Sequence, residues 1–335
     1  MDNSKKFLEV QRDFFGEIKK RVPANSSLVY AVSEALGLGL DGSYRRIRGS
    51  IVLNIKEIYT LCSRFGVSFD IMNSGAGMQQ FDCVYSPVNS SVPEEYKEYI
   101  LAVSQNFEKM RATEGSRIIQ SAVDIPMFHL LSHNELRFFN LYTYANSVYG
   151  YKGKWDDFIK VMSTPEIMEY HQKISDDYHH IPSTEIWTEN TLTPALQLIN
   201  YYLGLYMFDN KDFPLLLCAQ IMLIIDKIEQ WVDLGCKGEP ATPFQLYLSE
   251  MEPENAYTLF IAPESRNCIV KLFTINYLNV YDEAFCRETE DWLTKLTQRA
   301  VPLSGSSEKD RVRFFNAQRH KVHSLIQRID AHFEV

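Results

Sequence analysis

The stretch from Ser27 to Ser50 reads SLVYAVSEALGLGLDGSYRRIRGS and decides the fold of the N-terminal part of the chain. Its first half carries apolar residues at the i, i+3, i+4, i+7, i+8 spacing of an amphipathic helix, at Leu28, Ala31, Val32, Ala35 and Leu36. Gly37 follows the last of these, where helices commonly end because glycine tolerates a left-handed backbone. A second helix is expected to start near Asp41, a residue type that caps helix N-termini well. The stretch therefore predicts two short helices joined by a glycine-containing turn.

The second helix is expected to have an apolar inner side and a basic outer side. Leu40, Tyr44 and Ile47 recur at i, i+4 and i+7 and are assigned to the inner side. The outer side then holds Gly42, Ser43, Arg45, Arg46 and Arg48. A small, positive surface rich in hydrogen-bond donors suits insertion into the major groove of DNA.

Residues 28–70 resemble the helix-turn-helix of lambda-repressor-like (Cro/repressor, XRE-type) transcriptional regulators. Three segments carry the resemblance: AVSEALGL as first helix, SYRRIRG as recognition helix, and NIKEIYTLCSRFGVSFD as the helix that closes the domain. The resemblance extends over roughly residues 8 to 72 and implies a five-helix domain, the fifth helix lying around 68–72, that binds double-stranded DNA. The recognition helix departs from the family pattern at Asp41-Gly42, where a shorter, glutamine-rich start is common, so no base preference carries over.

The predicted DNA-binding residues are Ser27, Ser43, Tyr44, Arg45, Arg46 and Arg48. Arg45 and Arg46 are expected to contact bases or phosphates, with Ser43 close to base edges. Arg48 is expected to contact the DNA backbone, and Tyr44 to hold the helix on the domain. The N–H groups that begin the first helix, capped by Ser26 or Ser27, are a good phosphate anchor.

Gly37, Gly39 and Gly42 also spell G-x-G-x-x-G, the dinucleotide-binding fingerprint, with Glu57 downstream. That motif has its physical meaning only after a strand and before a helix, where the turn holds a pyrophosphate. Here a helical pattern precedes it, so a turn between helices is the preferred interpretation.

Charge and composition place the chain among globular proteins that carry no membrane segment. Residues 1–72 hold 11 of the 34 Lys and Arg but 8 of the 43 Asp and Glu, a net of +3, which leaves −12 for the remainder. The overall net charge of −9 is therefore no argument against DNA binding, because phosphates meet the local field. The polar N-terminus lacks a signal-peptide pattern, and the apolar run at 213–225 is too short to span a bilayer. Six scattered cysteines without a C-x-x-C pair favour a reducing cytoplasm.

The predicted fold is mainly α and has three parts. Residues 1–72 form the DNA-binding domain, the segment NSGAGMQQ at 73–80 a linker, and residues 81–335 a large, mostly helical effector or dimerisation domain, with a subdivision near 250 left open. A β-hairpin or small sheet is expected only near 257–281, where β-branched and aromatic residues flank the turn PESRN. Helices are expected from Pro93 and at 114–122, 134–149, 155–162, 165–177, 191–207, 213–233, 241–250, 283–300 and 307–332.

The sequence predicts a sequence-specific DNA-binding regulator that acts as a homodimer, with residues 81–335 dimerising or sensing a small-molecule or peptide effector. No catalytic residue, cofactor site or metal ligand is predicted; the histidine pairs at 179–180 and 320–323 are assigned structural or surface roles. Two alternatives stay open. One is a helical protein-interaction scaffold without DNA binding, and the other is an enzyme in 81–335 that the N-terminal domain regulates.

Overall fold

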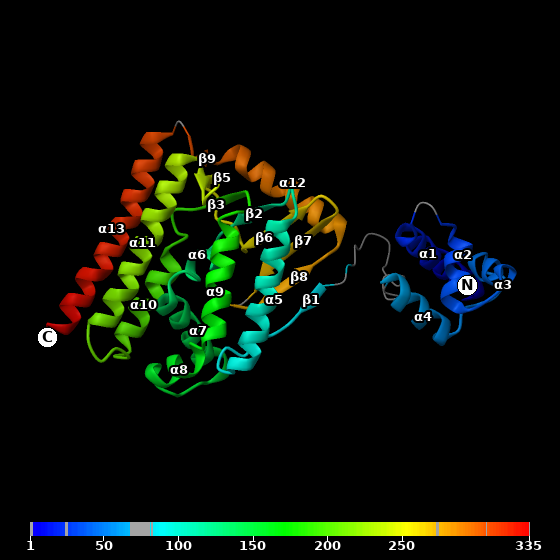
Figure 1. Cartoon of the computed structure of the whole chain (residues 1–335), viewed down its shortest axis with the longest axis horizontal. Coiled ribbons are helices and arrows are strands. Elements are labelled where there is room, and N and C mark those ends of the chain that lie inside the picture. The colour runs from blue at the N-terminus through cyan, green and yellow to red at the C-terminus, as the bar shows by residue number, and fades with distance from the viewer. Residues whose placement is uncertain are drawn as a thin grey trace. The chain divides into compact units, whose positions relative to one another are not determined.

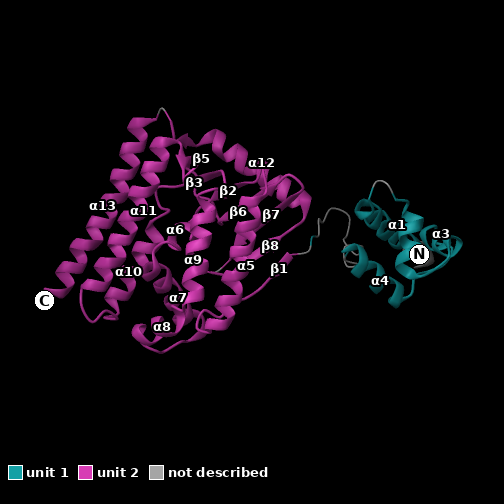
Figure 2. Cartoon of the chain, viewed as in Figure 1, with its two compact units in different colours: residues 1–82 teal, residues 83–335 magenta. Residues whose placement is uncertain are grey.

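The computed structural model describes residues 3–23, 26–67, 81, 83–272, 275–305 and 307–334. The chain divides into two compact units, which we call unit 1 (residues 1–82) and unit 2 (residues 83–335) (Figure 2). Each has its own hydrophobic core and is described by itself. The linker predicted at 73–80 lies outside the described residues.

Unit 1 is helical in its described part, which contains α1 (Asn3–Arg21), α2 (Leu28–Leu36), α3 (Leu40–Ile47) and α4 (Ile55–Phe65) (Figure 1). Its small core gathers apolar side chains from three of these helices and the segments beside α4, among them Phe14, Phe15, Ile18, Val32, Leu53, Leu61 and Val67. Gly37 and Gly66 both adopt φ of 63°, in the left-handed region, and end α2 and α4. The fifth helix predicted around 68–72 lies outside the described residues.

Within the described residues of unit 2, nine strands form one mixed sheet. They are β1 (Cys83–Tyr85), β2 (Arg117–Ser121), β3 (Ser183–Trp187), β4 (Cys236–Lys237), β5 (Thr242–Leu248), β6 (Tyr257–Ala262), β7 (Ser265–Lys271), β8 (Tyr277–Val280) and β9 (Val301–Pro302). Their order is β1-β8-β7-β6-β2-β3-β5-β4. The ninth strand, β9, lies outside this order and also pairs with β5. The β2–β3 and β3–β5 pairs are parallel, and the other pairs are antiparallel.

This sheet shows that the prediction of a mainly α fold was wrong. β6 and β7 do form a hairpin within 257–281, but it is one part of the larger sheet. β2 and β5 lie inside the segments 114–122 and 241–250, which were expected to be helical. β2 and β3 are central strands covered on both faces, so they lack the alternation that marks a strand in a sequence. β5 does alternate buried and exposed residues at its start, a signal that the helical interpretation overlooked.

The helices of unit 2 are α5 (Pro93–Ala112), α6 (Met127–Leu130), α7 (Asn134–Tyr149), α8 (Trp155–Met162), α9 (Pro165–Tyr178), α10 (Thr193–Gly204), α11 (Asp212–Leu234), α12 (Glu283–Arg299) and α13 (Glu308–Phe333). Apart from α6, each falls on a segment where the sequence predicts a helix, with ends shifted by a few residues at most. In the described residues no helix is long and apolar enough to cross a membrane.

Two cores flank the sheet because successive strand residues point to opposite faces. On one face Phe260 of β6 packs with Phe107 of α5, in a core that also takes in α7, α9, α11 and α13 (Figure 1). On the other face the neighbouring residue Leu259 packs against α12 through Leu293. Unit 2 is therefore a three-layer arrangement in which one face carries many helices and the other carries α12.

Candidate nucleic-acid interface

The turn between α2 and α3 is fixed by backbone and side-chain hydrogen bonds. Gly37 donates its N–H to Ser33 O, and the Ser33 hydroxyl donates to Leu38 O at 2.6 Å. Gly39 then precedes the first residue of α3 and has no side chain to cap the helix. The predicted N-cap, Asp41, lies instead in the first turn, where its carboxylate faces the positive end of the helix dipole. The G-x-G-x-x-G run thus follows a helix, not the strand that a dinucleotide site requires.

The face that α3 turns toward the domain differs from the predicted one. Ser43 is fully buried, and its hydroxyl donates to Gly39 O one turn earlier. Tyr44, expected to hold the helix on the domain, is 51% exposed, and Leu40 is 57% exposed. Serine can be buried here because its hydroxyl is satisfied by its own helix. The inner side of α3 therefore contains Ser43 and Ile47. It is rotated about the helix axis by roughly one residue from the predicted apolar side.

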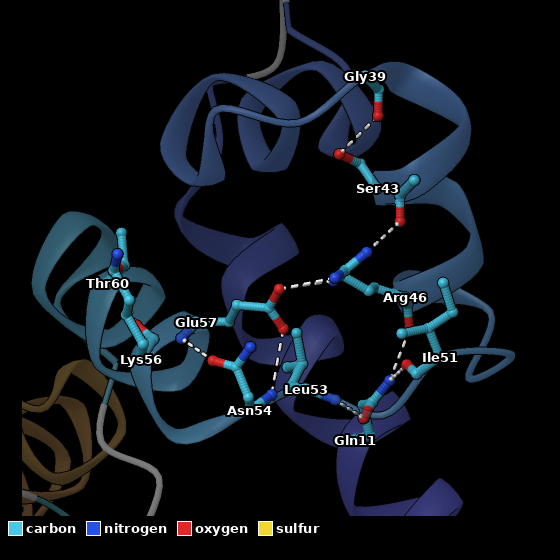
Figure 3. A network of polar contacts seen from close by, with 11 residues as sticks. Gln11, Gly39, Ser43, Arg46, Ile51, Leu53, Asn54, Lys56, Glu57 and Thr60 are labelled. Carbon is cyan, nitrogen blue, oxygen red and sulfur yellow. Dashed lines mark hydrogen bonds and ion pairs between the residues drawn. The ribbon is translucent and has the colours of Figure 1, made fainter.

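Arg46 is held by the protein itself (Figure 3). Its Nη2 and Nε lie 2.7 and 3.0 Å from Glu57 Oε1 in α4, and its Nη1 donates to Gly42 O at 3.1 Å. Only 15% of the Arg46 side chain and 13% of the Glu57 side chain are exposed. All three donor nitrogens named here already have acceptors, so Arg46 joins α3 to α4 and is not free for a base.

Glu57 has a second role at the start of α4. Its carboxylate accepts from the Asn54 N–H at 3.1 Å while the Asn54 side chain accepts from the Glu57 N–H at 2.9 Å, which completes a capping box (Figure 3). Burial alone would raise the pKa of Glu57, but the hydrogen bonds from Arg46 and from the Asn54 backbone, with the charge of Arg46, hold that pKa below its ordinary value of 4.5. Glu57 is therefore a carboxylate that ties α3 to α4.

Gln11 of α1 fixes the segment that follows α3 (Figure 3). Its amide nitrogen donates to Arg46 O at 2.7 Å and to Ile51 O at 2.9 Å, and its carbonyl oxygen accepts from Leu53 N at 3.0 Å. The side chain is buried, so these bonds form away from water. Sequence analysis did not single out Gln11, because a lone glutamine in an amphipathic helix carries no pattern.

Arg45 and Arg48 remain as cations without a partner in this part of the molecule. Both are exposed, and neither side chain makes a hydrogen bond or ion pair with any residue that the structure describes.

Ser27 caps α2, where its hydroxyl oxygen accepts from Tyr30 N at 3.2 Å. The backbone N–H groups of residues 28 and 29, which lie between Ser27 and Tyr30, are in the first turn of α2 and have no acceptor within the helix. We call Ser27, Tyr44, Arg45 and Arg48 the α2–α3 outer surface.

Unit 2 contains a second polar cluster, enclosed in its core around Glu185 of β3. The Glu185 carboxylate accepts from Trp187 Nε1 at 2.7 Å and from the Tyr178 hydroxyl, and lies 2.9 Å from His129 Nε2. Burial opposes ionisation of this carboxyl, but the charge and hydrogen bond of His129, with Tyr178 and Lys237, keep its pKa below the ordinary value. The cluster thus holds a carboxylate inside the protein.

Lys237 and Ser183, beside this carboxylate, have the arrangement of an activated nucleophile but not the access. Lys237 Nζ lies 2.6 Å from Ser183 Oγ, and burial holds the pKa of this lysine well below its ordinary value, a state in which lysine can serve as a base. Both side chains are buried, and the void lined by the adjacent His129 has a volume of about 10 Å³, room for one water. The pair is therefore part of the core of unit 2.

Other titratable groups noted in the sequence also have protein partners. Asp177 is buried and paired with Arg111 at 2.9 Å, and the His180 ring lies 2.7 Å from Asp176 O. Across the described ranges, no group of three or more His, Cys, Asp or Glu side chains is placed to hold a metal ion.

Comparisons of the chain with protein-family models, with curated proteins and with solved structures found no match.

Proposed function

We propose that this protein is a sequence-specific DNA-binding transcriptional regulator of the lambda-repressor-like helix-turn-helix type, with α3 as its recognition helix. The single observation that carries the proposal is the contrast between adjacent arginines of α3. Arg46 is locked to Glu57, whereas Arg45 and, one turn along, Arg48 are exposed and unpaired within the described residues. A rigid helix that presents free guanidinium groups is what recognition of guanine edges and phosphates requires.

Each residue of the α2–α3 outer surface has its own contact with DNA in this proposal. Arg45 reads a base edge or a phosphate, and Arg48 neutralises a backbone phosphate. Tyr44 presents an exposed ring to the groove, and the start of α2 at Ser27 receives a phosphate on its free N–H groups. Ser43 and Arg46, which the sequence suggested as contacts, are not part of this proposal, because one is buried and the other is engaged.

A homodimer that places two recognition helices on two half-sites is included in the proposal, because one such small domain offers little specificity. A reducing cytoplasm is included as well, since no disulfide joins the cysteines of the described residues.

The test is selection from a random duplex pool at two salt concentrations. Wild type is compared with Arg45→Ala/Arg48→Ala and with a matched control, Arg12→Ala/Lys19→Ala, which removes the same charge from exposed positions of α1. We expect wild type and control to enrich one motif, with affinity that falls steeply with salt. The α3 double variant should lose the motif, because a bidentate arginine–guanine pair contributes about 1–3 kcal/mol of discrimination. Retention of the motif by the α3 variant, or equal sequence-blind binding by all three proteins, would refute the proposal.

A protein-interaction role for unit 1 is the second candidate, favoured by an exposed apolar strip at the start of α4. Val52 is 66% exposed, and Ile55 and Tyr59, one helical turn apart, are 86% and 73% exposed. Such exposed apolar groups are typical of surfaces that bind other proteins. Sedimentation of wild type and Ile55→Lys separates the candidates: a scaffold would self-associate or capture protein through this strip and enrich no DNA motif.

A further inference from the structure

Unit 2 contains a cavity of about 800 Å³ between α5 and one face of the sheet. Strands β2, β6, β7 and β8 provide its floor, α5 one wall, and the segments around residues 86–88 and 124–128 its ends. In Figure 1, α5 passes in front of these strands, and its Phe107 contacts Phe260 of β6 edge-on at 5.6 Å between ring centroids. The volume lies within the range of about 300–1,000 Å³ that is usual for small-molecule sites.

The cavity is lined mainly by aromatic and apolar side chains. Six aromatic rings contribute, from Tyr99, Phe107, Phe128, Phe260, Tyr277 and Tyr281. Exposed lining residues on α5, such as Ala102, mark where the cavity meets solvent. Such a lining favours a ligand with a substantial apolar, ring-containing body.

Two amides of the floor have polar capacity that the protein does not use. Gln120 Oε1 on β2 and Asn267 Oδ1 on β7 are buried and have no hydrogen-bond partner among the described residues. A buried polar atom without a partner is costly, so these two amides favour an occupant that completes their bonding. β6 lies between their strands, with Thr258 opposite Gln120 and Phe260 opposite Asn267. Two strand spacings, about 9.6 Å in all, therefore separate the backbones of β2 and β7.

The charges on the lining balance and argue against an ionic ligand. Glu95, Glu98 and Asp124 are matched by Lys109, Arg266 and Lys271. Lys271 is paired with Asp124, and Arg266 with Glu283 and Glu290 at 2.9 and 3.0 Å. A polyanion such as a nucleotide would therefore find the two cations at the floor already neutralised.

We propose that this cavity is a binding site for an uncharged, largely apolar small molecule whose edge carries amide-like hydrogen-bond donors and acceptors. A carboxamide side chain offers both N–H and C=O, so a lactam or similar edge is its natural complement. The site belongs to unit 2 alone and does not depend on DNA binding. Its failure and that of the proposed function are therefore separate results.

The first experiment titrates Nile red, an uncharged apolar dye, into the full-length protein and follows its fluorescence. Wild type is expected to bind one equivalent saturably. Thr258→Phe fills the cavity from the centre of the floor, and Val103→Phe fills it independently from α5. Each variant that retains wild-type circular dichroism should bind at least about tenfold more weakly, whereas Ala284→Phe, an exposed change on α12, should bind as wild type does. Wild-type affinity in a folded filling variant, or non-saturable binding by wild type, would overturn the proposal.

The second experiment tests the polar edge by displacement of Nile red. Quinolin-2-one, a lactam, is compared with naphthalene, its apolar counterpart of similar shape. We expect the lactam to compete about tenfold better against wild type, and that preference to vanish in Gln120→Leu/Asn267→Leu. Equal competition by the two compounds against wild type, or a preference unchanged in the double variant, would contradict the assignment of these amides to ligand binding.

Discussion

In unit 1 the main polar network lies at the margin of a small core, whereas in unit 2 the main network is enclosed. The Arg46–Glu57 pair keeps about one seventh of each side chain in contact with solvent, but Glu185 is fully buried among aromatic groups. The marginal network holds α3 against α4 through Arg46, while the neighbouring Arg45 stays exposed. The enclosed network joins β3 to α6 and α9 and presents nothing to the outside. The comparison shows that a charged residue's role follows from its partners rather than from its type.

The largest expected effect is on the enclosed network. Glu185→Ala removes the acceptor of Trp187, Tyr178 and His129 together, so we expect unit 2 to lose about 3–5 kcal/mol of stability. Urea unfolding followed by tryptophan fluorescence measures this, because all four tryptophans lie in unit 2. Glu288→Ala, which changes an exposed glutamate, should stay within about 0.5 kcal/mol of wild type. A loss of under 1 kcal/mol for Glu185→Ala would mean that the network contributes little.

A smaller loss is expected when the marginal network is broken. Arg46→Ala removes a charge-assisted pair and leaves the largely buried Glu57 carboxylate without its cation, so unit 1 should lose about 2 kcal/mol. Amide hydrogen exchange of the α1 and α4 peptides should accelerate by about 30-fold. Arg45→Ala, the neighbouring change, should leave exchange unchanged while it weakens DNA binding. If both variants exchange alike, the division of roles between the two arginines fails.

Acid should act on unit 2 before unit 1. All eight histidines follow residue 82, and burial, with the charge of Arg137, lowers the pKa of His171 to about 3. Between pH 6.5 and 3 the unfolded chain therefore binds a proton that the folded chain does not, so stability falls as pH falls through this window. From pH 7 to 5.5 the loss from His171 is about 1 kcal/mol. Burial also lowers the pKa of His133 to about 4 and of His179 to about 3, which adds to the loss.

The measurement compares urea unfolding of wild type and His171→Gln at the two pH values. The variant should show a shallower decline by about 1 kcal/mol. In unit 1 the lowered pKa of Glu57 means that its stabilisation is present above pH 4.5 and is lost only as pH falls below that value. Loss of protection in unit 1 peptides before unit 2 peptides, at pH 5.5, would reverse the expected order.

The smallest expected effect concerns the cap of α4. Asn54→Ala removes one half of the capping box and should cost unit 1 about 1 kcal/mol. Asn54→Asp keeps an acceptor for the Glu57 N–H and should restore most of that loss. Hydrogen exchange at the first turn of α4 provides the measurement, and an Asp variant as labile as the Ala variant would show that the cap bond is not responsible.

The features that the sequence predicted correctly are those that depend on interactions between residues close together in the chain. The end of α2 at Gly37 and the capped start of α2 depend on residues within one turn, and both predictions are confirmed. The face of α3 was misjudged because Tyr44 was counted as apolar and Ser43 as polar, whereas serine satisfies its hydroxyl on Gly39 O. The Gln11 contacts span 35 to 42 residues, and no periodicity reveals them.

In unit 2 the missing information was which segments lie side by side. Glu185 becomes a network centre only because β3 lies between β2 and β5, and this pairing joins segments some 60 residues apart. Gln120 likewise faces a cavity only once β6, β7 and α5 are assembled around it. Helix periodicity was detectable in isolation, but parallel pairing was not.

The contacts of Gln11 determine how short a segment around α3 can be made without loss of its arrangement. Residues 27–50 contain both helices of the motif but lack the amide that closes the segment after α3 and the carboxylate that holds Arg46. Grafted alone onto another scaffold, this segment would keep its amino-acid sequence but lose the contacts that fix the orientation of Arg45. The smallest segment that keeps this arrangement therefore runs from α1 through α4, and a chimaera that begins after residue 11 would leave the segment after α3 without its contacts to α1.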